Sequence, residues 1–306
     1  MAIDHTPFIH PEDSAALEKL KAVPLLDTVV RQYMMSPVES MLRDMNMASR
    51  IRVGPNQMPE LHAVLTDVCR KLDMPVPRFF LEMNPDPDAY TGGVNEPFII
   101  LTTSAVELLP PDELVAVIAH QCGHILCNHQ LYHTLFDVMQ MGRGVFSVLR
   151  VGGVTTTLKW ALASWVRGSD LSADRVAVHV VDDVDVVARA ILRLSGVGAG
   201  VLAKVDVAQL VLQEEEYRAS VESSKAGSLV QGVAVRDLER LYPAARVTEL
   251  VRWRSGGTSG QEEARKQDPA AGRSGSQARP GVRERAAGLI AKVRVPWKSA
   301  RAGASE

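Results

Sequence analysis

The most informative segment of this 306-residue chain is LVAVIAHQCGHILCNH, residues 114–129. It follows the tetrapeptide PPDE at residues 110–113. That tetrapeptide predicts a helix start, because proline suits the first turn and acidic side chains favour the positive end of the helix dipole. His120 and His124 are four residues apart, so a helix places both imidazoles on one face, where one metal ion could bind both. Taken alone, the spacing also fits two histidines on an ordinary polar helix face.

Two later segments add to this pattern. Residues 165–175 read WVRGSDLSADR, and residues 242–253 read YPAARVTELVRW. In order and rough spacing, the three segments resemble three motifs of the HtpX-type zinc metalloproteases, a family that includes the CAAX-prenyl endopeptidases. Those motifs are approximately A-H-E-x-G-H-x-x-x-x-H, E-x-x-A-D-R and H-P-x-x-x-R. The resemblance covers about residues 10–254 and implies a zincin-like metalloprotease domain of the gluzincin type.

The resemblance implies a site for one zinc ion per chain. Its ligands would be His120, His124 and Asp170, which leaves the fourth coordination position open, as in catalytic zinc sites. Asp174 matches an acidic residue that orients a ligand histidine by a hydrogen bond. Arg246 matches a basic residue near the substrate. A purely structural ion pair between Asp174 and Arg246 is the alternative.

The sequence departs from the family motifs at three positions. Gln121 replaces the glutamate that acts as general base, and a neutral amide cannot take a proton from the attacking water. Asp170 is one methylene shorter than the family's glutamate. Tyr242 replaces a histidine, although its hydroxyl could still donate a hydrogen bond to an oxyanion. We therefore expect weak or absent activity. Gln121 is either a deliberate substitution or a natural divergence, and three departures together favour divergence.

Three short strands are expected before the metal-binding helix, at residues 78–83, 89–92 and 97–102. Turn residues separate them, so we predict a small antiparallel sheet. In the family, the strand before this helix pairs with an extended substrate. The resemblance therefore places substrate binding at Ala89, Tyr90, Thr91 and Gly92. An ordinary hairpin is the alternative.

Hydrophobic periodicity predicts helices in the rest of the chain. They fall within residues 10–50 and at 58–72, 110–129, 156–168, 171–196, 206–220 and 243–253. The predicted fold class is α+β and mostly helical, with one domain over residues 1–254. Within that domain, residues 10–50 form N-terminal helices and residues 51–254 the catalytic core.

Five further residues near the motif carry expectations of their own. Gly123 would let another element pass close to the metal-binding helix. His129 would point away from the metal, and His133 would face solvent. Cys122 and Cys127 fit no zinc-thiolate spacing and would be small buried residues.

Composition limits the classes of partner and compartment. The chain is 46% hydrophobic and 23% charged with a net charge of −2, which is typical of a globular protein and argues against a nucleic-acid partner. Three cysteines do not form a disulfide framework. The N-terminus lacks the basic start and apolar run of a secretory signal. No run of 18 apolar residues occurs, so we expect a reduced, cytoplasmic protein.

The C-terminal tail differs from the body. Residues 255–306 contain ten basic and five acidic side chains among many Gly, Ala and Ser residues, which is typical of a linker or disordered tail. Within it, residues 281–301 read GVRERAAGLIAKVRVPWKSAR. This basic amphipathic segment could contact an anionic membrane surface or an acidic partner. A solvated tail is the alternative.

Three functional hypotheses follow from these observations. The first is a zinc metalloendopeptidase that acts on extended peptide segments. The second is a zinc-binding pseudopeptidase that holds a peptide or partner protein without turnover. The third is a metal-free helical scaffold.

Overall fold

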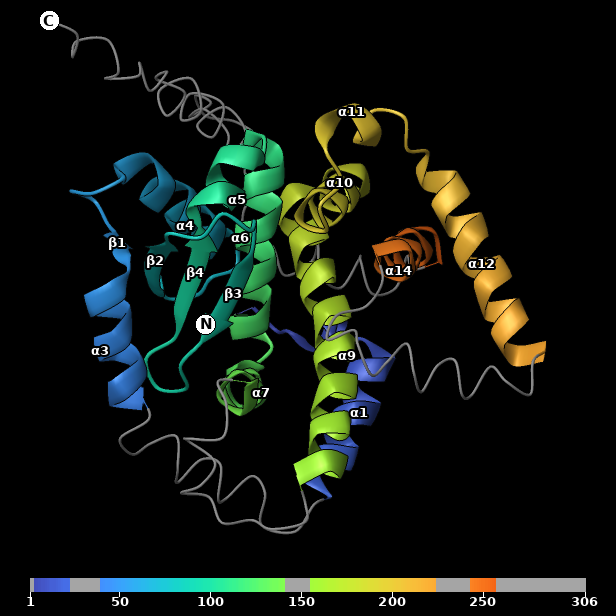
Figure 1. The fold of residues 1–306 in the computed structure, drawn as a ribbon, viewed down its shortest axis with the longest axis horizontal. Helices are drawn as coiled ribbons and strands as arrows, with labels where there is room; N and C mark the ends of the chain where they lie inside the picture. The colour runs from blue at the N-terminus through green and yellow to red at the C-terminus, as the bar shows by residue number, and fades with distance from the viewer. Residues whose placement is uncertain (1–2, 23–38, 141–154, 224–242, 257–306) are drawn as a thin grey trace, which may run out of the picture.

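Helix α6 (Pro111–Leu126), which carries the first motif, lies at the centre of the molecule (Figure 1). The structure is a computed structural model that describes residues 3–22, 39–140, 155–223 and 243–256. A small sheet and its helices lie on one side of α6, and a group of long helices lies on the other. Helix α6 packs against helix α9 (Thr155–Val181) and also contacts helix α4 (Pro59–Lys71) and the edge of the sheet.

The sheet has four strands in the order β1-β2-β4-β3. Their bounds are Ile51–Val53 (β1), Arg78–Glu82 (β2), Ala89–Gly92 (β3) and Phe98–Thr102 (β4). β1 pairs antiparallel with β2 and β3 pairs antiparallel with β4, but β2 and β4 run parallel. The prediction of an antiparallel sheet was therefore wrong for the central pair, and the sheet is mixed. All residues of β4 are buried, so this strand takes a central place and its hairpin partner β3 lies at the edge.

Helix α6 begins as its sequence predicts. Pro111 occupies the first turn, together with Asp112 and Glu113. The Glu113 carboxylate is buried and accepts hydrogen bonds from Arg193 Nε (2.6 Å) and Nη2 (3.1 Å). Arg193 belongs to helix α10 (Val184–Leu194), so this buried ion pair ties α10 to the start of α6.

Helix α9 joins two segments that we predicted as separate helices, 156–168 and the first part of 171–196. Gly168 does not end the helix. The break comes at Asp182, which has φ 57°, and at Asp183, whose carboxylate caps α10. Gly168 instead marks a crossing, because a Cβ there would lie 2.8 Å from the backbone nitrogen of Asp13. The predicted helix boundary was wrong because the glycine serves close packing rather than chain reversal.

The other helices are η1 (Thr6–Phe8), α1 (Pro11–Lys21), α3 (Glu39–Ser49), α5 (Thr103–Leu108), α7 (Gln130–Gln140), α11 (Ala199–Leu202), α12 (Val207–Ser223) and α14 (Pro243–Gly256). Four of them, α1, α3, α12 and α14, fall where helices were predicted, whereas η1, α5, α7 and α11 were not predicted. Helix α1 packs along α9 (Figure 1). None of the helices within the described ranges is long and apolar enough to cross a membrane. Tyr242 and residues 281–301 lie outside the described residues.

Candidate metal centre beside the sheet edge

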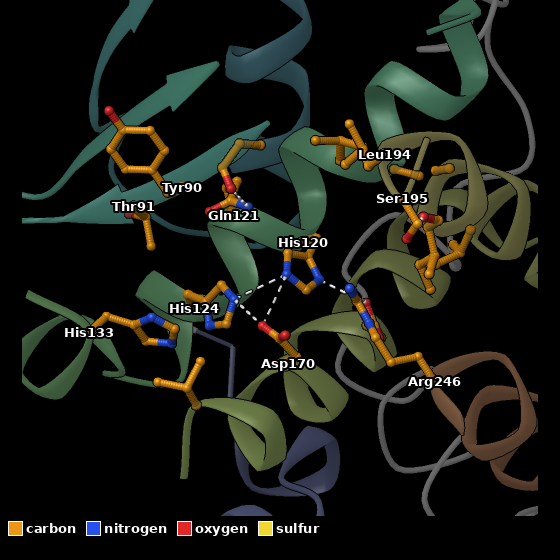
Figure 2. Close-up of a pocket in the computed structure, with 18 of the residues that line it drawn as sticks. Tyr90, Thr91, His120, Gln121, His124, His133, Asp170, Leu194, Ser195 and Arg246 are labelled. Carbon is orange, nitrogen blue, oxygen red and sulfur yellow. Dashed lines mark hydrogen bonds and ion pairs between the residues drawn. The ribbon is translucent and has the colours of Figure 1, made fainter. Parts of the chain in front are cut away.

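The three predicted ligands converge in one cavity (Figure 2). His120 and His124 project from α6, and their Nε2 atoms lie 3.0 Å apart. Asp170 projects from α9, and its Oδ1 lies 3.4 Å from His124 Nε2 and 3.8 Å from His120 Nε2. Tetrahedral zinc, with bonds of about 2.0–2.2 Å, holds its ligand atoms roughly 3.3 Å apart. These donor atoms therefore have both the spacing and the chemistry of a zinc site.

Charges around the cavity favour metal binding. Burial would raise the pKa of Asp170, but the positive charge of Arg246 and the hydrogen bond to His124 lower it well below its usual value. Burial lowers the pKa of His124 to about 3, in spite of the neighbouring Asp170. The carboxylate is therefore ionised and the imidazole neutral at pH 7, which are the states that a metal requires of its ligands.

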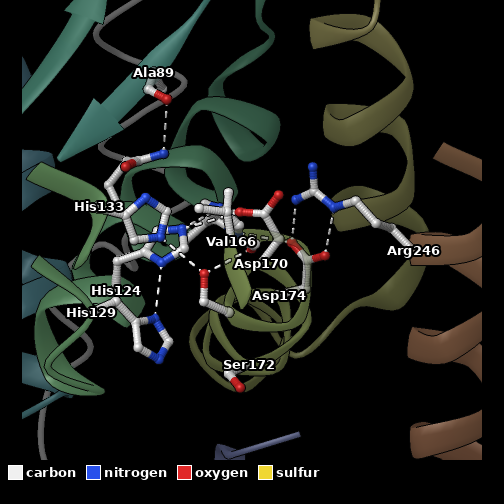
Figure 3. A network of polar contacts seen from close by, with 12 residues as sticks. Ala89, His124, His129, His133, Val166, Asp170, Ser172, Asp174 and Arg246 are labelled. Atoms are coloured by element: carbon white, nitrogen blue, oxygen red, sulfur yellow. Dashed lines mark hydrogen bonds and ion pairs between the residues drawn. The ribbon is translucent and has the colours of Figure 1, made fainter. Parts of the chain in front are cut away.

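Asp174 connects the metal-binding helix to the C-terminal helix α14. Its Oδ1 accepts a hydrogen bond from His120 Nδ1 at 2.8 Å, which directs Nε2 of that ring towards Asp170. The same carboxylate receives two hydrogen bonds from Arg246, at 2.8 and 2.6 Å (Figure 3). Burial alone would raise the pKa of Asp174, yet Arg246 and His120 lower it. The two predicted roles of Asp174, orienting a ligand histidine and forming an ion pair with Arg246, are therefore compatible, because one carboxylate contacts both side chains.

Gln121 lies on the sheet side of α6, at the cavity wall (Figure 2). Its side chain is buried, and Nε2 donates a hydrogen bond to the carbonyl of Ala89 in β3 at 3.2 Å. Its Oε1 is also buried and has no hydrogen-bond partner among the residues that the structure describes. An ionised glutamate could not donate to Ala89, so the amide is suited to this contact.

β3 lies at the edge of the sheet and lines the cavity with Ala89, Tyr90 and Thr91. The backbone N–H and C=O groups of successive residues in a strand point to opposite sides. Those of Thr91 therefore point away from β4, on the same side as the Ala89 carbonyl. Helix α7 closes the far end of this edge, where Thr134 Oγ1 accepts a hydrogen bond from the Gly93 N–H. The edge that faces the cavity is therefore short.

The side chain of Tyr90 is held by contacts within the sheet region rather than directed at the histidines. Its hydroxyl donates to Glu82 and accepts from Arg50 Nη2, and its ring points away from His120 (Figure 2). Burial and the hydrogen bond to Glu82 raise the pKa of this phenol. Tyr90 therefore contributes backbone to the edge, while its side chain binds Glu82 at the end of β2, across the intervening strand β4.

His129 points away from the predicted metal position, as expected, but His133 does not behave as expected. α6 ends at Leu126, and Asn128 has φ 59°, so His129 leaves the helical course that we assumed. Its Nδ1 lies 3.0 Å from His124 Nδ1, behind the face that binds Asp170. The expectation that His133 faces solvent was wrong, since it lines the cavity and lies 2.9 Å from Ser169 Oγ. Burial lowers the pKa of His133 well below its ordinary value.

Two buried residues near His129 were missed by the sequence analysis. Asp13 on α1 is 1% exposed, and its Oδ2 lies 3.0 Å from His129 Nε2. Ser172 on α9 donates a hydrogen bond of 2.6 Å to the same oxygen. A signal was present, because Asp13 shares the apolar face of α1 with Leu17 and Leu20. A carboxylate on such a face needs a buried partner.

Gly123 and the cysteines agree with expectation. A Cβ on Gly123 would lie 3.0 Å from Ala173 Cα and from Val176 Cβ, so glycine allows α9 to approach α6. Cys69, Cys122 and Cys127 are all buried and free.

A helix that carries H-x-x-x-H, an acidic residue from a later helix and an edge strand beside the first helix define a zincin-type metalloprotease domain. Comparison with known families agrees with this class. The chain belongs to peptidase family M48, whose sequence profile matches residues 55–220, more than half of the chain. The resemblance to HtpX-type zinc metalloproteases is thereby confirmed.

Several curated proteins are similar over long stretches. Plastoglobule-localized metallopeptidase 48, chloroplastic, of Arabidopsis thaliana is 29% identical over 254 residues, which cover 82% of this chain and 73% of that protein. A protease HtpX homolog of Lactobacillus helveticus is 26% identical, covering 67% of this chain and 65% of its own length. Protease HtpX homolog 2 of Methanosarcina mazei is 24% identical over 47% of this chain and 58% of its own. No solved structure gives a significant match.

Proposed function

We propose that this chain binds one zinc ion through His120, His124 and Asp170 and is a metalloendopeptidase for extended peptide segments, with slow turnover. The observation that carries the proposal is the convergence of three donor atoms in a cavity that the edge strand β3 also lines. Membership of a peptidase family supports the reaction class.

Each residue has a role in this proposal. When bound, zinc would supply Lewis-acid chemistry and make a nearby water more acidic. Asp174 holds His120 in place, and the outward backbone groups of Thr91 would pair with the substrate. Gln121 Oε1 would accept a hydrogen bond from the attacking water, but it cannot remove the proton. General acid–base help of that kind is typically worth about 10²–10⁴-fold in rate.

One apolar wall of the cavity indicates which kind of substrate side chain it would bind. It is formed by apolar residues of α6 and α10, namely Val117, Val187, Ile191 and Leu194. Such a wall favours a peptide with an apolar side chain next to the cleaved bond, because burial of that side chain would stabilise the complex.

A zinc-binding pseudopeptidase is the second candidate. It is favoured by the hydrogen bond between Gln121 Nε2 and the Ala89 carbonyl, which links α6 to the edge strand in a way that a carboxylate could not. In that case the cavity holds a peptide without cleaving it.

Zinc content tests the shared part of both candidates. Purified protein, dialysed after zinc loading, should retain about one zinc per chain. His120→Ala should abolish retention, whereas His62→Ala, a change on α4, should leave it intact. A zinc content near zero in the unaltered protein would refute both candidates.

Turnover distinguishes the two candidates. We expect Gln121→Glu to raise casein hydrolysis by about 10²–10⁴-fold, since it restores a proton acceptor at the cavity. The matched control is Gln121→Glu combined with His120→Ala, which should be inactive. A zinc-loaded Gln121→Glu protein that cleaves no unfolded substrate would favour the pseudopeptidase.

We also propose that residues 281–301 attach the chain to an anionic lipid surface, which would add a peripheral location to the cytoplasmic one. The plant relative is named for its location at plastoglobules, and the segment is basic and amphipathic. Such attachment weakens with salt. The full chain should sediment with anionic liposomes at low salt and less at high salt. Equal sedimentation of a chain ending at Trp253 would contradict this.

A further inference from the structure

Each ring nitrogen of His124 has a different neighbour. Nε2 faces His120 and Asp170 at the cavity, whereas Nδ1 lies 3.0 Å from Nδ1 of His129 (Figure 3). The far nitrogen of His129, Nε2, lies 3.0 Å from Asp13 Oδ2. A continuous line of polar contacts therefore runs from the cavity through two imidazoles to a carboxylate on α1.

The carboxylate determines where the protons in this line must be. An ionised carboxylate only accepts hydrogen bonds, so His129 Nε2 must carry a proton and donate it. In a neutral ring, Nδ1 of His129 is then an acceptor, and the donor must be the N–H at Nδ1 of His124. That leaves the lone pair of His124 on Nε2, the nitrogen that faces His120 and Asp170.

We propose that Asp13 and His129 are positioning residues of the metal centre, which fix the tautomer and orientation of His124 for metal binding through Nε2. This inference rests on the proposed zinc site. The second histidine ligand, His120, has an analogous partner, because the Asp174 carboxylate contacts its Nδ1. Such outer partners of metal ligands typically contribute about 10–100-fold in metal affinity.

The surroundings hold the line in place. Asp13 and His129 are 1% and 2% exposed, so water does not compete for their contact. Ser172 donates a second hydrogen bond to Asp13 Oδ2, and its own Oγ accepts one from the backbone N–H of His10. The ring of Trp165 lies edge-on to His129, with centroids 5.5 Å apart.

A different metal position is the main competitor. His124, His129 and His133 also have nitrogen atoms within 4.8 Å of one another. A metal held there would compete with the site beside Asp170 for His124. Of these three, His129 is not among the described residues that line the cavity, and its Nε2 already faces Asp13 Oδ2 at 3.0 Å. The geometry therefore favours the hydrogen-bonded line.

Zinc affinity tests the inference without any activity assay. The full chain is titrated with zinc against a chromophoric chelator, for the unaltered protein and for Asp13→Asn. Asparagine keeps the size of the side chain but removes its charge, so we expect zinc binding about 10–100-fold weaker. The matched control is Glu12→Gln, which removes an exposed acid one residue away on α1 and should leave affinity unchanged.

Two further measurements cover the other outcomes. Histidine ¹⁵N NMR of the zinc-loaded unaltered protein should find N–H at Nδ1 of His124 and at Nε2 of His129, a result independent of whether any variant folds. His133→Asn should leave zinc affinity within about threefold, well below the effect expected for loss of a positioning contact.

The reverse tautomer, or equal zinc affinity in folded Asp13→Asn, would overturn the inference while leaving the zinc site intact. Loss of zinc on His133→Asn would overturn it by assigning the metal to the second histidine group. Absence of zinc from the unaltered protein would refute both the site and this inference.

Discussion

Each of the three thiols in this chain is shielded within the protein interior. Cys69 and Cys122 are 1% and 0% exposed, and their sulfur atoms lie 4.0 Å apart between α4 and α6. The hydrogen bond to Cys69, together with burial, raises the pKa of Cys122 well above its ordinary value, and burial raises that of Cys127. Thiols of this kind are poor nucleophiles.

We therefore expect no thiol to react with a chromogenic disulfide reagent in the folded protein at pH 8. All three should react after denaturation in guanidinium chloride. The absorbance of the released thiolate gives the number of reactive thiols in the folded and in the denatured protein. Rapid labelling of Cys69 or Cys122 in the folded state would contradict the packing of α4 against α6.

At the scale of elements, the crossing of α1 over α9 depends on Gly168. A Cβ there would lie 2.8 Å from the nitrogen and 2.9 Å from the Cα of Asp13, which are backbone atoms that cannot rotate away. Alanine improves helix propensity by up to about 1 kcal/mol, but forced overpacking costs about 1–3 kcal/mol. The clash should outweigh the propensity.

Gly168→Ala should therefore lower the free energy of unfolding by about 1–2 kcal/mol and weaken zinc binding, because α1 must shift with Asp13. Urea unfolding and zinc titration measure the two effects. Gly200→Ala is the control, since a Cβ at Gly200 meets no atom within 4 Å. A more stable Gly168→Ala protein would mean that α1 can move without loss.

Whether a segment is a helix or a strand could be predicted from local sequence, whereas the pairing of the strands and the packing of the helices could not. The helix from Pro111 and the strand at residues 89–92 follow from caps, turns and alternation. The parallel pairing of β2 with β4 depends on which strand the core surrounds, and local patterns do not contain that information. The continuity of α9 through Gly168 was missed for the same reason, because the role of this glycine comes from a helix about 155 residues earlier in the sequence.

At the scale of the whole molecule, Glu249 on α14 joins the N-terminal and C-terminal helices. It accepts a hydrogen bond from Arg218 on α12 at 2.9 Å and faces His10, which precedes α1, at 3.4 Å. Arg252 lies 3.3 Å from the same carboxylate. The hydrogen bond to His10 and the contacts with Arg218 lower the pKa of Glu249 to about 2, although burial opposes them.

This depressed pKa predicts a pH-dependent contribution to stability. A carboxylate with a lower pKa in the folded state stabilises the protein above its unfolded pKa, near 4.5, and the contribution is lost as the pH falls towards 2. Glu249→Gln should therefore be less stable than the unaltered protein at pH 7, with a difference that shrinks below about pH 4.5. Urea unfolding across this range measures it. If the difference in stability between the two proteins grows on acidification, the stabilising contacts of Glu249 with His10 and Arg218 are contradicted.

The metal centre shows the same limit of sequence analysis at this scale. His120, His124, Asp170, Asp174 and Arg246 could be identified because they stand in motifs of fixed spacing. The contact of His129 with Asp13 could not, since it spans 116 residues and needs α6 to end where it does. Motif spacing encodes neighbours on one helix, but the packing of α1 on α9 is a property of the folded chain.

The buried carboxylate of Asp174 also has a consequence for the order of events during translation. Its partner Arg246 lies 72 residues further along the chain and emerges from the ribosome much later. Until then Asp174 has no cation to offset its burial, and a buried unpaired charge is strongly unfavourable. A nascent chain that ends before α14 therefore lacks a finished centre. Synthesis of α14 therefore sets the moment at which the cluster of His120, Asp170 and Asp174 can be completed.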